Sequence, residues 1–211
     1  MAFTIKLILT VACVGLWLLT QKILGQRKVP FKDRISDCVL QWTERQNAYL
    51  HKNPRVANGL LIASSLVIDA LGIFIIVQTL WGDSVRPLLA LLVLFTLRQI
   101  NQAITMLPTP PGMIWRDPGV PSLFVTYGVS NDLFFSGHTA LAVLGALELA
   151  QLGGPLFMTL AAFVVAFEIL VVLLLRAHWT MDVFAGAVTA AWVYDLIGRF
   201  APSVDAWIAG F

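Results

Sequence analysis

Charged side chains are scarce in this chain, and their scarcity excludes a water-soluble globular domain. Only 12% of the 211 residues are Asp, Glu, Lys or Arg and 58% are apolar, against about 25% and roughly 45–50% in an average soluble domain. The composition therefore indicates an integral membrane protein, and the length leaves room for a single membrane domain, residues 1–211.

Cysteine is scarce as well. Cys13 lies in an apolar run and Cys38 stands alone, so we expect neither a disulfide framework nor a cysteine metal site. The net charge is only +2 and no stripe combines basic with aromatic residues, so no nucleic-acid partner is expected. No cluster of acidic residues suggests a metal, and no cofactor is predicted.

The apolar residues gather in runs of membrane-spanning length. A helix needs roughly 20 residues to cross a bilayer, and six runs reach that length, near residues 3–25, 57–81, 86–106, 132–153, 155–175 and 180–198. The first has no small-x-small cleavage site after it, so we read it as a helix rather than a signal peptide. We expect an all-α, multi-pass bundle of about six transmembrane helices.

Two connecting segments differ from these runs. Residues 26–56 are charged with scattered apolar positions, which is typical of an amphipathic segment at the membrane interface. Residues 107–131 hold five prolines and three glycines, so this segment is predicted to be irregular. We expect it to form a shaped cover over a site within the core at 57–198.

Two of the three histidines lie at the ends of predicted spans. His138 belongs to FFSGHT, and His178 is followed four positions later by Asp182. In one helix this spacing places both side chains on one face, so we expect Asp182 to accept a hydrogen bond from one ring nitrogen and leave the other as a nucleophile. With six spans, His138, His178 and Asp182 reach the same membrane face. An isolated interfacial histidine is ordinarily structural, but the pairing favours catalysis.

Two arginines are candidates for phosphate binding. Arg98 lies within a span, where a charge costs ~2.5–3.5 kcal/mol on insertion scales, so it needs a partner. One candidate partner is a carboxylate such as Asp69 or Glu168, in a structural ion pair. The functional alternative is that Arg98 or Arg176 binds a phosphate, whose geometry suits the guanidinium fork. Two histidines with an arginine describe phosphoryl transfer through a phosphohistidine, and the membrane location indicates a lipid headgroup.

The same residues carry a resemblance to a known family. D-x-x-x-S-G-H-T at 132–139 and H-W-T-x-D-V at 178–183 resemble motifs of the lipid phosphatase and phosphotransferase superfamily typified by type 2 phosphatidic acid phosphatases. The stretch RQINQAITMLPTPPGM at 98–113 is similar to an element of its sphingomyelin synthase branch, with altered spacing. Within that branch the chain is most similar to plant phosphatidylcholine:diacylglycerol cholinephosphotransferases.

This resemblance implies roles for single residues. His178 is the expected nucleophile, Asp182 orients it, and His138 exchanges a proton with the leaving and incoming alcohols. Ser136 lies in the matched motif as a substrate contact. Asp132 either contacts the substrate or caps a helix, since acidic side chains bond free N–H groups at helix starts.

Departures from the phosphatase pattern favour a transferase. Phe135 precedes Ser136 where a proline is expected, Val172 stands where an arginine is expected, and no K-x6-R-P motif is present. Transfer requires that water be kept from the phosphohistidine, which the cover at 107–131 is suited to do.

The sequence allows two roles for the aromatic residues near the site. Trp115, Tyr127 and Trp179 are candidates to cradle a trimethylammonium headgroup by cation–π attraction. Each is also the kind of residue found in an interfacial aromatic belt.

The sequence therefore predicts an enzyme that moves a phospho-headgroup, with phosphocholine from phosphatidylcholine to diacylglycerol or ceramide as the best candidate. A lipid phosphate phosphatase and a non-catalytic scaffold or transporter are the alternatives. Two signals disagree on which side the site faces. Ten cations on the motif side against three on the other indicate the cytoplasm, whereas the resemblance implies the lumen or exterior.

Overall fold

The computed structural model describes residues 2–26, 37–127 and 133–210, and all regular structure in these residues is α-helical. The helices are α1 (Ala2–Gly25), α2 (Cys38–Trp42), α3 (Glu44–Lys52), α4 (Pro54–Trp81), α5 (Arg86–Ile104), α6 (Gly137–Ala150), α7 (Gly154–Leu174) and α8 (Thr180–Ala209). Five of them, α1, α4, α5, α7 and α8, are long and apolar enough to cross a membrane. The protein is an all-α, multi-pass membrane protein, as its composition predicts.

The fourth expected span is shorter than its apolar run. It begins at Gly137 instead of residue 132, because the Ser136 hydroxyl accepts a hydrogen bond from the Thr139 N–H (3.3 Å) and caps the helix. It ends before Gly153 and Gly154, whose positive φ angles turn the chain toward α7. The resulting α6 has 14 residues, so its N-terminal end, with His138, lies inside the bundle.

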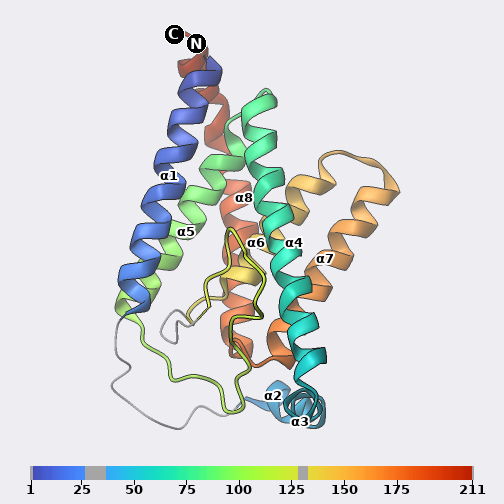
Figure 1. Cartoon of the computed structure of the whole chain (residues 1–211). Helices are drawn as coiled ribbons and strands as arrows, with labels where there is room; N and C mark the ends of the chain where they lie inside the picture. The colour runs from blue at the N-terminus through green and yellow to red at the C-terminus, as the bar shows by residue number, and fades with distance from the viewer. Residues whose placement is uncertain (1, 27–36, 128–132, 211) are drawn as a thin grey trace.

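The last helix is longer than expected and continues through Pro202 to Ala209. Its final turns are held by Asp205, which accepts hydrogen bonds from the Ser84 hydroxyl (2.6 Å) and the Val85 N–H (2.8 Å) at the start of α5. The end of α8 and the first turns of α1 lie at the end of the bundle opposite α2 and α3 (Figure 1).

Helix α6 is the centre of the bundle and contacts α4, α5, α7 and α8. Close approach depends on small residues, as is usual between membrane helices. A Cβ atom at Gly186 of α8 would lie 2.6 Å from the Ser136 carbonyl oxygen, and one at Gly145 of α6 would lie 3.0 Å from Leu71. In contrast, α1 lies at the outside of the bundle beside α5 (Figure 1).

The segment after α5 is irregular in its described parts, as its prolines predict. It folds back between the helices instead of lying outside them (Figure 1). Asp69 of α4 anchors it by accepting hydrogen bonds from the Ser122 hydroxyl (2.9 Å) and from the N–H groups of Leu123 (2.9 Å) and Phe124 (3.0 Å). We call residues 105–127 the cover segment.

Residues 37–52 of the charged segment form the short helices α2 and α3 below the bundle (Figure 1). Trp42 is 77% exposed and Tyr49 is 56% exposed. Exposed aromatic rings are suited to a membrane interface, and that role stays a prediction for this segment.

Candidate active site

The two motif histidines reach one cavity although they are 40 positions apart in the sequence. His138 comes from the first turn of α6, and His178 from the turn before α8. The cavity is bounded by α1, α4, α5 and the cover segment, with the lining residues Trp17, Gln21, Ile68, Phe95, Arg98, Met113, Trp115, Phe124, Val125, Thr126, Leu133, Gly137, His138, Leu141, Ala177 and His178. We call it the histidine cavity.

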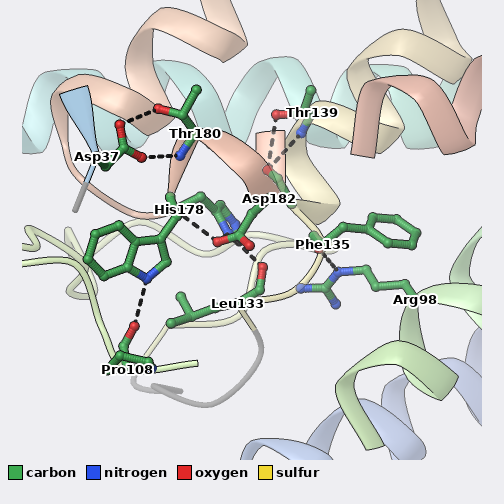
Figure 2. A network of polar contacts seen from close by, with 11 residues as sticks. Asp37, Arg98, Pro108, Leu133, Phe135, Thr139, His178, Thr180 and Asp182 are labelled. Carbon is green, nitrogen blue, oxygen red and sulfur yellow. Dashed lines mark hydrogen bonds and ion pairs between the residues drawn. The ribbon is translucent and has the colours of Figure 1, made fainter. Parts of the chain in front are cut away.

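The environment of His178 differs from the expected helical pair. His178 precedes α8, which begins at Thr180, so His178 and Asp182 do not share a helix face. Its Nδ1 lies 3.0 Å from the Leu133 carbonyl oxygen and 3.8 Å from Asp182 Oδ2 (Figure 2). The expected hydrogen bond to Asp182 is therefore wrong for this geometry. A carbonyl oxygen only accepts, so Nδ1 carries a proton, and in the neutral imidazole Nε2 then keeps its lone pair.

Asp182 is engaged at the start of its own helix. Its Oδ2 accepts a hydrogen bond from the Trp179 N–H (2.9 Å), which caps α8 and explains why the carboxylate does not reach the imidazole. Its backbone carbonyl accepts from the Ser136 N–H (2.9 Å) and so joins the start of α8 to the start of α6. The side chain is fully buried, and Oδ1 has no hydrogen-bond partner among the described residues. Asp182 thus supplies negative charge close to His178.

His138 lies against the cover segment. The Trp115 ring is perpendicular to it (88°) with 5.1 Å between the ring centroids. Its Nε2 is buried and makes no hydrogen bond in the part of the chain that the structure describes. A buried nitrogen in this state costs free energy unless a ligand pairs with it, so the atom is suited to contact a substrate.

Arg98 crosses the bundle to the start of α6. Nε donates to the Phe135 carbonyl oxygen (2.9 Å) (Figure 2). Nη1 donates to Gln21 Oε1 (3.1 Å). The guanidinium lies against Gly137, where a Cβ atom would be 3.0 Å from Nε. The carboxylates considered as its partners are used elsewhere: Asp69 holds the cover segment, and Glu168 accepts from the Ser64 hydroxyl (2.7 Å). Arg98 therefore places positive charge beside His138.

The other arginine is directed away from this cavity. Arg176 has a positive φ of 52°, and its Nη1 and Nη2 donate to the carbonyl oxygens of Pro111 (2.6 Å) and Leu40 (2.9 Å). It joins α2 to the cover segment and is not part of the cavity lining. Phosphate binding by Arg176 stays a prediction without geometric support.

The other described residues that are predicted to contact the substrate have hydrogen-bond or ring partners within the protein. The Tyr127 hydroxyl is 2.5 Å from Oγ of Ser65 in α4, and the Tyr127 ring centroid is 4.9 Å from that of Trp115. Tyr127 therefore links the Trp115 ring to α4. Trp179 is 4% exposed and its Nε1 donates to the Pro108 carbonyl (2.8 Å). The Ser136 hydroxyl accepts from the Thr139 N–H and hydroxyl. Asp132 lies outside the described residues.

Sequence reasoning missed three contributors. Asp37 accepts hydrogen bonds from Val39 and Leu40 at the start of α2 and from the Thr180 N–H (2.7 Å) and hydroxyl (2.8 Å) at the start of α8 (Figure 2). Its position before a helix is a recognisable start signal. Gln21 is a polar residue within a span, which also invites attention. Leu133 acts through its carbonyl, which has no signal in the sequence.

The hydrogen bonds to Asp37 change its acidity. Partial burial by itself raises the pKa of a carboxyl group, but the donors from Thr180, Leu40 and Val39 stabilise the charged form and outweigh burial. The pKa of Asp37 is therefore below its ordinary value of 3.8. The charged carboxylate holds the turn that carries His178.

Comparison with known proteins adds an independent finding. No curated protein and no solved structure matches the chain. The family model described as AtPDCT1/2 matches residues 36–199, which is most of the chain and contains both histidine motifs. The chain belongs to this family, the phosphatidylcholine:diacylglycerol cholinephosphotransferases.

Proposed function

We propose that the protein transfers phosphocholine from phosphatidylcholine to diacylglycerol through a phosphohistidine on His178. One observation carries the mechanism: the 3.0 Å hydrogen bond from His178 Nδ1 to the Leu133 carbonyl. It fixes the tautomer in which Nε2 has a lone pair, and this is the requirement for attack on phosphorus.

The reaction has two half-reactions. In the first, His178 Nε2 attacks the phosphorus, and the bond from phosphorus to the glycerol oxygen breaks with its electron pair on oxygen. Protonated His138 gives that oxygen a proton, and diacylglycerol leaves. In the second, His138 takes the proton of an incoming diacylglycerol hydroxyl, whose oxygen attacks the phosphorus, and the electron pair of the broken phosphorus–nitrogen bond returns to Nε2.

Charges near the histidines support both steps. Asp182 Oδ2, 3.8 Å from Nδ1, stabilises the positive charge that the imidazole acquires when Nε2 bonds to phosphorus. Arg98 lies beside Gly137 and His138 and stabilises the negative phosphate oxygens. Both residues interact more strongly with the transition state than with the resting enzyme, which is what raises the rate.

Transfer requires an acceptor lipid to outcompete water. The cover segment is folded into the bundle, and its Trp115 ring lies on His138, so it supports exclusion of water from the phosphohistidine. Trp115 is also the aromatic residue best placed to contact a trimethylammonium group. Membership of the sphingomyelin synthase branch, with ceramide as a second acceptor, belongs to the same proposal, and a phosphatase acting on phosphatidic acid is the alternative.

The test is a thin-layer assay with purified protein in mixed micelles, choline-labelled phosphatidylcholine, and fluorescent diacylglycerol and ceramide in separate reactions. We expect fluorescent phosphatidylcholine from the fluorescent diacylglycerol acceptor with wild type, and none with His178→Ala or His138→Ala. After alkaline denaturation, choline label should remain on wild-type protein and be absent from His178→Ala. Phosphate release from phosphatidic acid without headgroup transfer would establish the phosphatase instead.

A further inference from the structure

We propose that a second, apolar cavity between α1, α4 and α5 binds an acyl chain of the glycerolipid substrate, with the Trp17 indole N–H donating a hydrogen bond to the lipid ester carbonyl. This inference rests on the proposed function, because it assigns the same substrate's tail. The empty space in and around this cavity, including the part open to the surroundings, is about 560 Å³. Its wall includes Cys13, Val14, Gly72, Leu88 and Leu92.

The two cavities share a wall. Trp17, Phe95, Phe124 and Leu141 line both the histidine cavity and the apolar one. The Trp17 ring contacts the other two aromatic rings, since its centroid lies 5.0 Å from that of Phe95 and 5.7 Å from that of Phe124. A molecule in one cavity therefore lies against the same rings as a molecule in the other.

The order of chemistry along this path matches a phospholipid. The histidine cavity carries His138, His178 and Arg98 for a phosphate, whereas the apolar cavity has Gln99 and Thr96 as its polar lining side chains apart from the Trp17 indole. In a glycerolipid the phosphate is followed by glycerol, then by ester groups, and then by acyl chains. The shared aromatic wall stands where the glycerol and its esters belong.

One residue of the shared wall, Trp17, carries an unsatisfied polar group. The Trp17 Nε1 atom is buried and has no hydrogen-bond partner among the described residues. Buried indole N–H groups are usually paired, because an unpaired one loses its hydration without replacement. An ester carbonyl accepts hydrogen bonds and donates none, so it is the complement that an indole N–H requires.

Part of the cavity wall lies at the outer surface of the helix bundle. Leu16 of α1 lines the cavity and is 63% exposed, and Thr96 of α5 lines it and is exposed. Helices α1 and α5 lie side by side (Figure 1), so a chain entering between them comes directly from the hydrocarbon layer. Phe124 closes the inner side and fits against Gly72, where a Cβ atom would lie 2.5 Å from the ring.

The first test fills the cavity. Leu92→Trp introduces bulk where Leu92 lines the wall, and Leu170→Trp makes the same change at a 59% exposed position on α7. With dioctanoylphosphatidylcholine as donor, transfer to dioleoylglycerol is compared with transfer to dioctanoylglycerol. Each buried methylene contributes about fourfold in binding. We therefore expect the kcat/KM for dioleoylglycerol, divided by that for dioctanoylglycerol, to fall about tenfold or more in Leu92→Trp and to stay unchanged in Leu170→Trp. Equal losses for both acceptors would overturn the assignment.

The second test removes, in turn, the two partners of the proposed hydrogen bond: the indole N–H and the ester carbonyl. Trp17→Phe deletes the indole N–H, and a dialkylglycerol lacks the ester carbonyls. We expect wild type to prefer the diester by about two- to tenfold, the effect of one hydrogen bond, and Trp17→Phe to show no preference. The same preference in both proteins would show that Trp17 does not bond the ester.

A third measurement is independent of transfer. A diacylglycerol with a diazirine near the end of one chain is photolysed with the full-length protein in phosphatidylcholine vesicles, and the labelled peptides are identified by mass spectrometry. We expect label in α1 and α5 that excess unlabelled diacylglycerol displaces. Transfer without displaceable label there would overturn the acyl-chain site, whereas displaceable label without transfer would support the site and contradict the proposed function.

Discussion

At the scale of single residues, the roles proposed for the candidate catalytic groups depend on which atoms they reach. His178 is oriented by a backbone carbonyl, and Asp182 stands 3.8 Å away. In the familiar His and Asp pair the carboxylate both orients and stabilises the imidazole. In the mechanism proposed above, the Leu133 carbonyl orients the imidazole, so the role assigned to Asp182 is electrostatic stabilisation.

This division predicts the effect of Asp182→Asn. The amide oxygen still accepts from the Trp179 N–H, so the cap of α8 is kept, but the negative charge is lost. Opposite charges about 4 Å apart interact by about 4 kcal/mol at the effective dielectric of protein sites, and the imidazole is charged only in part at the transition state. We expect kcat to fall about tenfold to a hundredfold with KM little changed, measured by the thin-layer assay.

The control is a variant that removes the helix cap together with the charge. Asp182→Ala removes both charge and cap, and it should lower the melting temperature while Asp182→Asn does not. If Asp182→Asn matched His178→Ala in losing all activity, Asp182 would have a role beyond stabilising charge. If it had full activity, the electrostatic role would be wrong.

At the scale of helices, the site depends on how closely α6 and α8 approach. A Cβ atom at Gly186 would lie 2.6 Å from the Ser136 carbonyl oxygen, and that atom belongs to the backbone and cannot rotate away. Gly186→Ala should therefore push the two helix starts apart and separate His138 from His178.

We expect Gly186→Ala to cost about 1–3 kcal/mol of stability, as overpacking usually does, and to reduce transfer strongly. Gly198→Ala is a matched control on the same helix, because nothing lies within 4 Å of its Cβ position. It should be neutral or slightly stabilising, since alanine is the better helix former. Thermal melting in detergent and the transfer assay together check both variants.

Asp37 makes the same region sensitive to pH. Because its pKa is lower in the folded protein than its ordinary value of 3.8, its stabilisation is present above that value and is lost as pH falls through the lowered one. We expect the melting temperature of wild type to decline across this acidic window. The decline should be smaller in Asp37→Asn.

A second carboxylate separates this effect from general acid denaturation. Glu44→Gln removes an exposed carboxylate at the start of α3 and should leave the wild-type pH profile unchanged. At neutral pH, Asp37→Ala should destabilise by about 1 kcal/mol, the typical value of a helix cap. An identical acid profile in wild type and Asp37→Asn would contradict the role of Asp37.

At the scale of the whole molecule, the proposed mechanism requires the cover segment to keep water from the phosphohistidine. Asp69 holds it through three hydrogen bonds from residues 122–124. Asp69→Ala releases these donors, so we expect water to compete better and the ratio of released phosphocholine to transferred phosphocholine to rise severalfold. Asp195→Ala is a control, because Asp195 pairs with Arg199 on an exposed face of α8. An unchanged ratio in Asp69→Ala would mean that the cover segment does not exclude water.

Some of this organisation is readable along the chain. Runs such as Pro54–Trp81 have the length and apolar character of a membrane-spanning helix. The five prolines of residues 107–127 preclude regular structure in that segment. The two histidine motifs stand out because polar residues are rare beside spans. Each of these features depends only on residues that are close together in the sequence, so it can be predicted from the sequence.

The sequence by itself determined the helical class, the membrane location, the irregular cover and the identity of both histidines. Tertiary structure decided the hydrogen bond from His178 to the Leu133 carbonyl, the use of Asp182 as a helix cap, and the separation of Arg98 from Arg176. It also decided that the histidine cavity adjoins an apolar one. The physical reason is that hydropathy and capping act between near neighbours, whereas a backbone carbonyl or a cavity wall becomes a partner only when distant segments pack together.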